Sequence, residues 1–121
     1  MNISLEDYQK LDPKCTVEFE GKKLIFQTPN LLTKYRADNL FTKEPGTIDW
    51  LNEIRPKEIL LDIGANVGMY TIYAAIVRDA TVFALEPESQ NYSLLNKNIR
   101  LNELDHIVSA YCVGISDVDS F

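Results

Sequence analysis

The sequence predicts an α/β fold in which a short parallel sheet follows an amino-terminal antiparallel hairpin. Residues 58–63 and 81–85 are short apolar runs typical of buried strands, and the apolar segment 67–77 between them has the length of a helix. A strand, a helix and a second strand in this order form a right-handed crossover with parallel strands. A further strand is expected at 107–113, which would complete a three-stranded parallel sheet.

The amino-terminal part of the chain is predicted to form a unit apart from this sheet. Residues 1–13 are mostly polar, which indicates a loose arm or a short helix. Residues 16–27 alternate apolar and polar side chains on both sides of a Glu-Gly pair, the pattern of two antiparallel strands with one covered face. We therefore expect an arm and a β-hairpin over residues 1–28, and the main domain over residues 29–121.

The segments that connect these strands are predicted to be mainly helical. Residues 30–40 are expected to be helical or irregular, and Thr47 is a candidate N-cap for a short helix that Pro56 ends. Another helix is expected at 87–102. Its asparagine side chains are expected to lie on a solvated face.

A glycine turn follows the first strand of the sheet and brings polar residues to its carboxyl end. Gly64 and Gly68 permit a positive φ or the close approach of a ligand, and Asn66 tolerates a left-handed conformation better than other non-glycine residues. Glu86 ends the next strand, near the spacing of about 20 residues at which an acid meets ribose hydroxyls. Ligands bind at the carboxyl ends of parallel strands, so Asp62, Gly64 and Glu86 are predicted to line a nucleoside site.

A dinucleotide-binding oxidoreductase is an alternative, because a glycine turn with a distant acid also occurs in NAD(P)-binding domains. Their fingerprint is Gly-x-Gly-x-x-Gly, and counted from Gly64 the second and third glycines are replaced by Asn66 and Met69. Asp62 also places negative charge beside the position of the phosphates. A cationic nucleoside without phosphate is favoured, and S-adenosyl-L-methionine has this chemistry.

Four segments taken together resemble the FkbM-type methyltransferases. They are Glu-Pro-Gly-Thr-Ile-Asp-Trp at 44–50, Asp-Ile-Gly-Ala-Asn-Val-Gly-Met-Tyr-Thr at 62–71, Glu-Pro-Glu-Ser-Gln-Asn-Tyr-Ser-Leu-Leu at 86–95 and Val-Gly-Ile-Ser-Asp at 113–117. The resemblance runs from about residue 29 to the end. It implies a Rossmann-like, S-adenosylmethionine-dependent methyltransferase that acts on a hydroxyl oxygen of a sugar or another small metabolite.

The resemblance also implies which residues contact the cofactor. The methionine part is expected near the glycine turn, the ribose at Glu86 and the adenine near the end of the third strand. The implied residues are Asp62, Gly64, Ala65, Asn66, Gly68, Tyr70, Glu86, Pro87, Asn91, Val113 and Asp117. Glu44 and Thr47 are further candidates, although a helix cap is the favoured role of Thr47. No catalytic base is identified.

Several of these residues have simpler structural interpretations that remain open. Asp62 can cap the glycine turn, and Glu86 can cap the helix that follows it. Tyr70 can be a core residue, and Asp117 can be a turn residue. A noncatalytic interaction module on the same fold is therefore a further alternative to an enzyme.

Composition limits the partners that we expect. A net charge of −6 and a pI near 4.7 disfavour a nucleic-acid groove, because phosphate binding depends on Lys and Arg. A single histidine with Cys15 and Cys112 gives neither metal-ligand spacing nor a disulfide framework. The sequence has no signal peptide and no apolar run long enough for a membrane span. A cytoplasmic enzyme with a small-molecule acceptor is expected.

The length of 121 residues is short for a sheet of this type, which has about seven strands. We therefore expect the chain to hold only the amino-terminal half of the domain. The central strand would then have an open apolar edge, through which the chain could self-associate.

Overall fold

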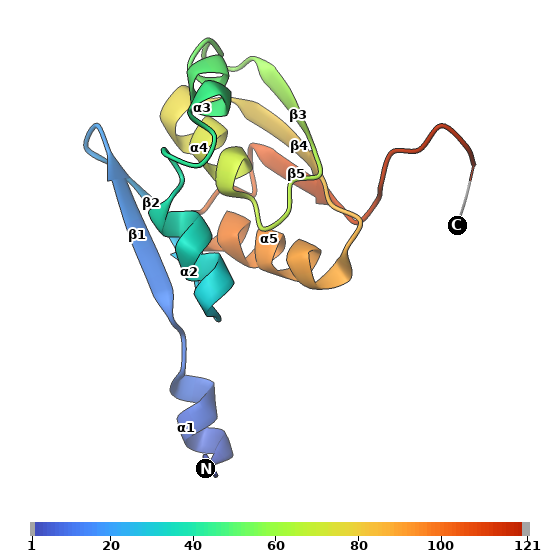
Figure 1. Cartoon of the computed structure of the whole chain (residues 1–121). Helices are drawn as coiled ribbons and strands as arrows, with labels where there is room; N and C mark the ends of the chain where they lie inside the picture. Colours follow the sequence, from blue (N-terminus) through green and yellow to red (C-terminus); the bar gives the residue numbers. More distant parts are fainter. Residues whose placement is uncertain (1, 120–121) are drawn as a thin grey trace.

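A computed structural model describes residues 2–119 of the chain (Figure 1). Its elements in chain order are α1 (Leu5–Lys10), β1 (Lys14–Phe19), β2 (Lys22–Gln27), α2 (Leu31–Asp38), α3 (Pro45–Leu51), β3 (Ile59–Ile63), α4 (Met69–Arg78), β4 (Thr81–Leu85), α5 (Ser89–Leu101) and β5 (Val108–Tyr111). The predicted combination of an antiparallel hairpin and a parallel sheet is confirmed.

The strands of the parallel sheet lie in the order β3-β4-β5, which is also their order along the chain. Leu60 pairs with Val82 in the first ladder, and Ala84 pairs with Ala110 in the second. The crossover from β3 through α4 to β4 is the one that the apolar runs predict. The last strand ends at Tyr111, earlier than predicted, so Val113 lies beyond it.

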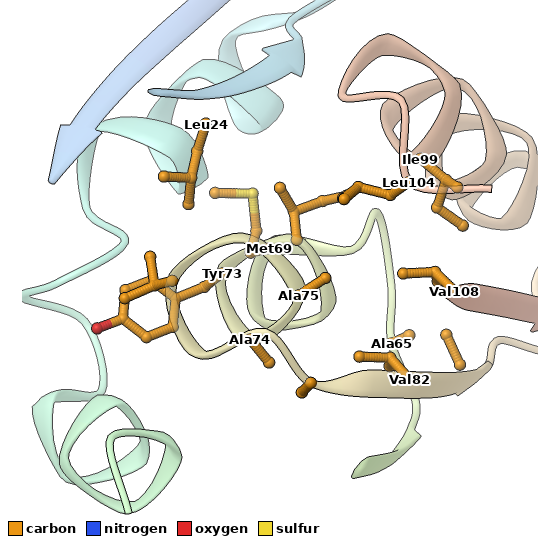
Figure 2. Close-up of a cluster of buried hydrophobic side chains, with 14 of the residues drawn as sticks. Leu24, Ala65, Met69, Tyr73, Ala74, Ala75, Val82, Ile99, Leu104 and Val108 are labelled. Atoms are coloured by element: carbon orange, nitrogen blue, oxygen red, sulfur yellow. The ribbon is translucent and has the colours of Figure 1, made fainter. Parts of the chain in front are cut away.

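Helix α4 begins later than the sequence predicts, because the turn before it occupies more residues. Gly64, Asn66 and Gly68 all have positive φ, which confirms the predicted left-handed positions. Most of the helix is buried on every side, with Ile72, Tyr73 and Ala74 at 0% exposure. Figure 2 shows its side chains pointing in different directions, toward the hairpin, toward α5 and toward the sheet.

The hairpin packs on the domain through α4 and α5. Leu24 and Phe26 of β2 are buried in the common core. Asn98 accepts a hydrogen bond from Gln27 N at 2.8 Å, and Asn102 bonds both the N–H and the carbonyl of Ile25. The solvated face predicted for these asparagines is therefore wrong. Their amides pair instead with backbone groups of β2, a strand that is distant in the sequence.

The caps of the helices differ from the predicted ones. Helix α2 has a capping box between Asn30 and Thr33, whereas α3 begins with Pro45 at its first turn. Thr47 lies inside α3, so its predicted N-cap role is wrong; a proline has no N–H to satisfy and suits that first position. Helix α5 is capped by the Glu88 side chain, which accepts from two backbone N–H groups of its first turn.

Helices α4 and α5 cover one face of the parallel sheet, and the other face is open. Ile59, Leu61 and Ile63 of β3 project from the open face and are more than half exposed. Within residues 2–119, β3 pairs only with β4, so its outer edge has no strand partner. None of the helices in this part of the chain has the length and apolar composition that crossing a membrane requires.

Candidate functional site

The glycine turn is tied to the end of β4 by backbone hydrogen bonds. The N–H groups of Gly64 and Ala65 both donate to the Leu85 carbonyl at 2.9 Å. Asn66 N donates to Glu86 Oε1 at 2.8 Å. The turn and the carboxyl ends of β3 and β4 therefore form one rigid rim, as the crossover predicts.

Glu86 is buried at this rim and connects the turn to the next helix. Its second carboxylate oxygen accepts from Glu88 N at 2.9 Å, and the residue is only 6% exposed. Each carboxylate oxygen has a further lone pair, so Glu86 keeps acceptor capacity for a ligand. The side chain that caps α5 is that of Glu88. At the start of this helix, Glu86 accepts only from the backbone N–H of Glu88.

Asp62 is held by a side chain of α4. Thr71 Oγ1 donates to Asp62 Oδ2 at 2.6 Å, and no turn N–H donates to this carboxylate. Burial raises the pKa of the Asp62 carboxyl above its usual range; the charge of Glu86 acts in the same direction, and the Thr71 hydrogen bond opposes both. The structure therefore gives Asp62 an anchoring contact to α4 in place of the turn cap considered from the sequence.

The two glycines of the turn are required for different reasons. A Cβ on Gly64 would meet no atom within 4 Å, so the space beside it is open to a ligand. A Cβ on Gly68 would lie 2.6 Å from Leu95 Cδ1. Gly68 therefore allows α5 to approach the start of α4.

A cavity of about 180 Å³ opens beside the turn. Its lining residues come from α2, the α2–α3 connection, the turn and the first turn of α4: Arg36, Asn39, Leu40, Lys43, Glu44, Gly64, Ala65, Asn66, Met69 and Tyr70. Four of the predicted site residues, Gly64, Ala65, Asn66 and Tyr70, thus lie together, and Glu44 joins them. Thr47 does not line the cavity.

Tyr70 and Glu44 form a pair in this cavity. The Tyr70 hydroxyl donates to Glu44 Oε2 at 2.6 Å. Burial, followed by this hydrogen bond, raises the pKa of Tyr70 to about 12. Tyr70 therefore stays protonated near neutral pH and holds the carboxylate of Glu44 in place.

Arg36 reaches the same cavity from α2, although no motif in the sequence predicts this position. Its Nη1 donates to Asn66 Oδ1 at 3.0 Å. The two residues are far apart in the sequence, and no local pattern indicates their contact. An arginine in the last turn of a helix is otherwise typical of a solvated residue.

The predicted adenine-side residues lie outside the cavity. Val113 is about half exposed and Asp117 is exposed, both in the segment after β5. Gly114 passes close to Pro87, because a Cβ on Gly114 would lie 3.4 Å from the proline ring. Asn91 lies in the first turn of α5, where its N–H donates to Glu88. Val113 and Asp117 therefore lie at an open edge beyond the end of β5, apart from the residues that line the cavity.

Comparison with known proteins places the chain among methyltransferases. The family model of the TRM5/TYW2 methyltransferase domain matches residues 42–121. No curated protein matches the sequence. The FkbM-type family expected from the sequence is not the family that matches, so this narrower assignment is not supported.

Solved structures of several methyltransferases have a fold similar to that of this chain. Pyrococcus horikoshii TYW2 in complex with MeSAdo superposes with a TM-score of 0.58 at 21% identity, covering 86% of this chain and 37% of that one. Methanocaldococcus jannaschii Trm5 in complex with adenosine gives 0.56 at 20% identity, covering 91% and 32%. A Geobacter sulfurreducens S-adenosylmethionine-dependent methyltransferase with S-adenosyl-L-homocysteine gives 0.53 at 12% identity, covering 63% and 32%.

These similarities confirm the predicted Rossmann-like methyltransferase fold. The chain spans between 32% and 37% of the length of these three structures.

Proposed function

The chain belongs to the TRM5/TYW2 methyltransferase domain family, and we propose on this basis that it carries the cofactor site of an S-adenosylmethionine-dependent methyltransferase. The observation that carries the proposal is the position of the cavity. It opens beside Gly64, at the carboxyl ends of parallel strands, where the matched region holds the glycine turn and Glu86.

The residues present fit this cofactor. The open space at Gly64 admits a ligand next to the backbone, and Glu86 retains lone pairs for two ribose hydroxyls. Asp62 and Glu86 make the rim unfavourable for a pyrophosphate and suitable for a cationic group. We assign the methionine part to the cavity and the ribose to Glu86. Pro87, Asn91, Val113 and Asp117 remain proposed neighbours of the adenosine at the open edge.

The cofactor supplies an activated methyl group, and the chain supplies alignment and a proton acceptor. Alignment of two reactants is worth roughly 7–11 kcal/mol in favourable cases. Glu44 is the one carboxylate among the residues that line the cavity, and the Tyr70 hydroxyl fixes its orientation. We propose that Glu44 accepts the proton that the methyl acceptor releases.

We propose a tRNA as the acceptor, because the matched family acts on tRNA. This replaces the sugar or small-metabolite hydroxyl expected from the sequence. The net charge of −6 argued against a nucleic acid, but phosphate contacts depend on local charge. Lys43 is such a local cation beside the cavity.

Isothermal titration calorimetry separates this function from its alternatives. The 121-residue chain is titrated with S-adenosyl-L-homocysteine and, separately, with NADH. Binding of S-adenosyl-L-homocysteine with a stoichiometry near one, and no heat with NADH, is expected. Binding of NADH alone would establish the oxidoreductase alternative, and binding of neither would favour a noncatalytic module.

A further inference from the structure

Arg36 is a cation in the cavity that forms no salt bridge with an acidic side chain within residues 2–119. Within residues 2–119, no carboxylate lies within the 4.0 Å of a salt bridge from its guanidinium. The residue is half-buried, so its charge is only partly solvated. A ligand with a negative charge would offset the cost of partly burying this cation without a salt-bridge partner.

The fold directs Arg36 into the cavity. Thr33 and Ala37 form the buried side of α2, and the capping box at Asn30 fixes where the helix begins. Leu40, one turn after Arg36, is also buried and lines the same cavity. The position of Arg36 is therefore set by the packing of α2.

The guanidinium has donors to spare. Five N–H groups form its rigid fork, and the structure gives one hydrogen bond, from Nη1 to Asn66. Carboxylates match this fork with two parallel hydrogen bonds. The group that Arg36 suits best is therefore a planar carboxylate.

Asn66 relates Arg36 to the predicted ribose site. Its side chain accepts from Arg36 while its backbone N–H donates to Glu86. A ligand that lies along the turn would meet Glu86 at one end and Arg36 at the other. An amino-acid nucleoside has sugar hydroxyls at one end and a carboxylate at the other.

We propose that Arg36 binds the α-carboxylate of the methionine part of the cofactor and so distinguishes it from nucleosides that lack an amino-acid tail. This inference rests on the proposed function. Arg36 precedes the matched region, which begins at residue 42. Helix α2, outside the family match, would thereby complete the cofactor site.

Two ligands with the same nucleoside test the proposal. S-adenosyl-L-homocysteine has the carboxylate, whereas 5′-methylthioadenosine does not. Arg36→Gln is expected to weaken S-adenosyl-L-homocysteine by about 10- to 100-fold, the range for lost hydrogen bonds between charged groups. The affinity for 5′-methylthioadenosine should stay within about 2-fold of the wild type. Both dissociation constants are measured by calorimetry.

Lys34→Gln is the matched control, because it removes one positive charge from the same helix. Lys34 is exposed and pairs with Asp38, away from the cavity. This variant should bind both ligands like the wild type. Arg36→Lys, which keeps the charge and loses the fork, should fall between wild type and Arg36→Gln for S-adenosyl-L-homocysteine.

Three results would overturn the inference. Equal weakening of both ligands by Arg36→Gln would mean that Arg36 only positions Asn66. Unchanged binding of both ligands would mean that the carboxylate lies elsewhere. If the wild type binds neither ligand, the proposed function fails and the inference fails with it.

Discussion

At the scale of single residues, the two glycines of the turn, Gly64 and Gly68, differ in their surroundings: the space beside Gly64 is open, whereas Gly68 packs against α5. Both have positive φ, which costs a residue with a side chain about 1–2 kcal/mol. Only Gly68 also faces a neighbouring side chain, Leu95. The sequence predicts the same role for both glycines, because their spacing in the turn does not indicate which one contacts another helix.

We expect Gly68→Ala to destabilise the fold by about 2–4 kcal/mol, the combined cost of the backbone conformation and overpacking against Leu95. Gly64→Ala should cost about 1–2 kcal/mol, because only the backbone term applies. Urea denaturation followed by circular dichroism measures both. Equal losses for the two variants would contradict the different roles.

Asp62 gives a prediction for pH. Because burial raises its pKa in the folded state, the folded protein binds this proton more tightly than the unfolded chain does. The stabilising contribution of protonated Asp62 is complete below the ordinary value of 3.8 and is lost as the pH rises through the higher folded value. Wild type should therefore lose stability relative to Asp62→Asn as the pH rises.

Urea denaturation of both proteins between pH 4 and about pH 7 tests this, within the range where carboxyl groups titrate. Asparagine is the suitable replacement because its Oδ1 can still accept from Thr71. A difference in unfolding free energy that stays constant, or that grows in favour of wild type, would show that burial does not penalise the charge of Asp62.

At the scale of elements, the parallel strands and the crossover follow from apolar runs that turns interrupt. The helix caps and the docking of the hairpin do not follow from such runs. Thr47 resembles an N-cap, yet Pro45 already starts the helix. The sequence predicts that Asn98 and Asn102 are solvated, although their partners are backbone groups of a hairpin distant in sequence. Arg36 also contacts a residue distant in sequence, Asn66, so no local pattern predicts its position in the cavity.

The docking of the hairpin depends on Asn98, which is fully buried. Its amide also donates to the Val67 carbonyl at 2.7 Å, so it connects β2 to the turn before α4. We expect Asn98→Ala to destabilise the protein by about 2–5 kcal/mol, because it leaves the buried Val67 carbonyl and the partly buried Gln27 N–H unpaired. Thermal and urea unfolding measure this loss.

Asn96→Ala is the matched control on the same helix. Asn96 is half-buried and donates only to the carbonyl of Tyr92, within α5. Its loss should be under about 1 kcal/mol. If the two variants lose the same stability, the bonds from α5 to β2 do not hold the hairpin.

At the scale of the whole molecule, the open face of the parallel sheet is an exposed apolar surface. Ile59, Leu61 and Ile63 form a row on β3, next to an edge that has no strand partner within residues 2–119. Exposed apolar strands of this kind pair with other chains. The predicted edge is therefore present.

We expect the chain to self-associate as its concentration rises, and Leu61→Glu to shift it toward the monomer. The Leu61 side chain is 54% exposed, so the charge should not disrupt the core. Sedimentation velocity over a range of concentrations measures this. A wild type that remains a monodisperse monomer would contradict self-association through β3.

The position of the ligand tests the proposed cofactor site most directly. Backbone amide shifts from nuclear magnetic resonance are recorded while S-adenosyl-L-homocysteine is added to the labelled protein. We expect the largest changes at Gly64, Asn66 and Glu88, whose N–H groups hold the turn and the Glu86 carboxylate. Changes confined to other parts of the chain, or no changes at saturating ligand, would contradict a nucleoside site at the glycine turn.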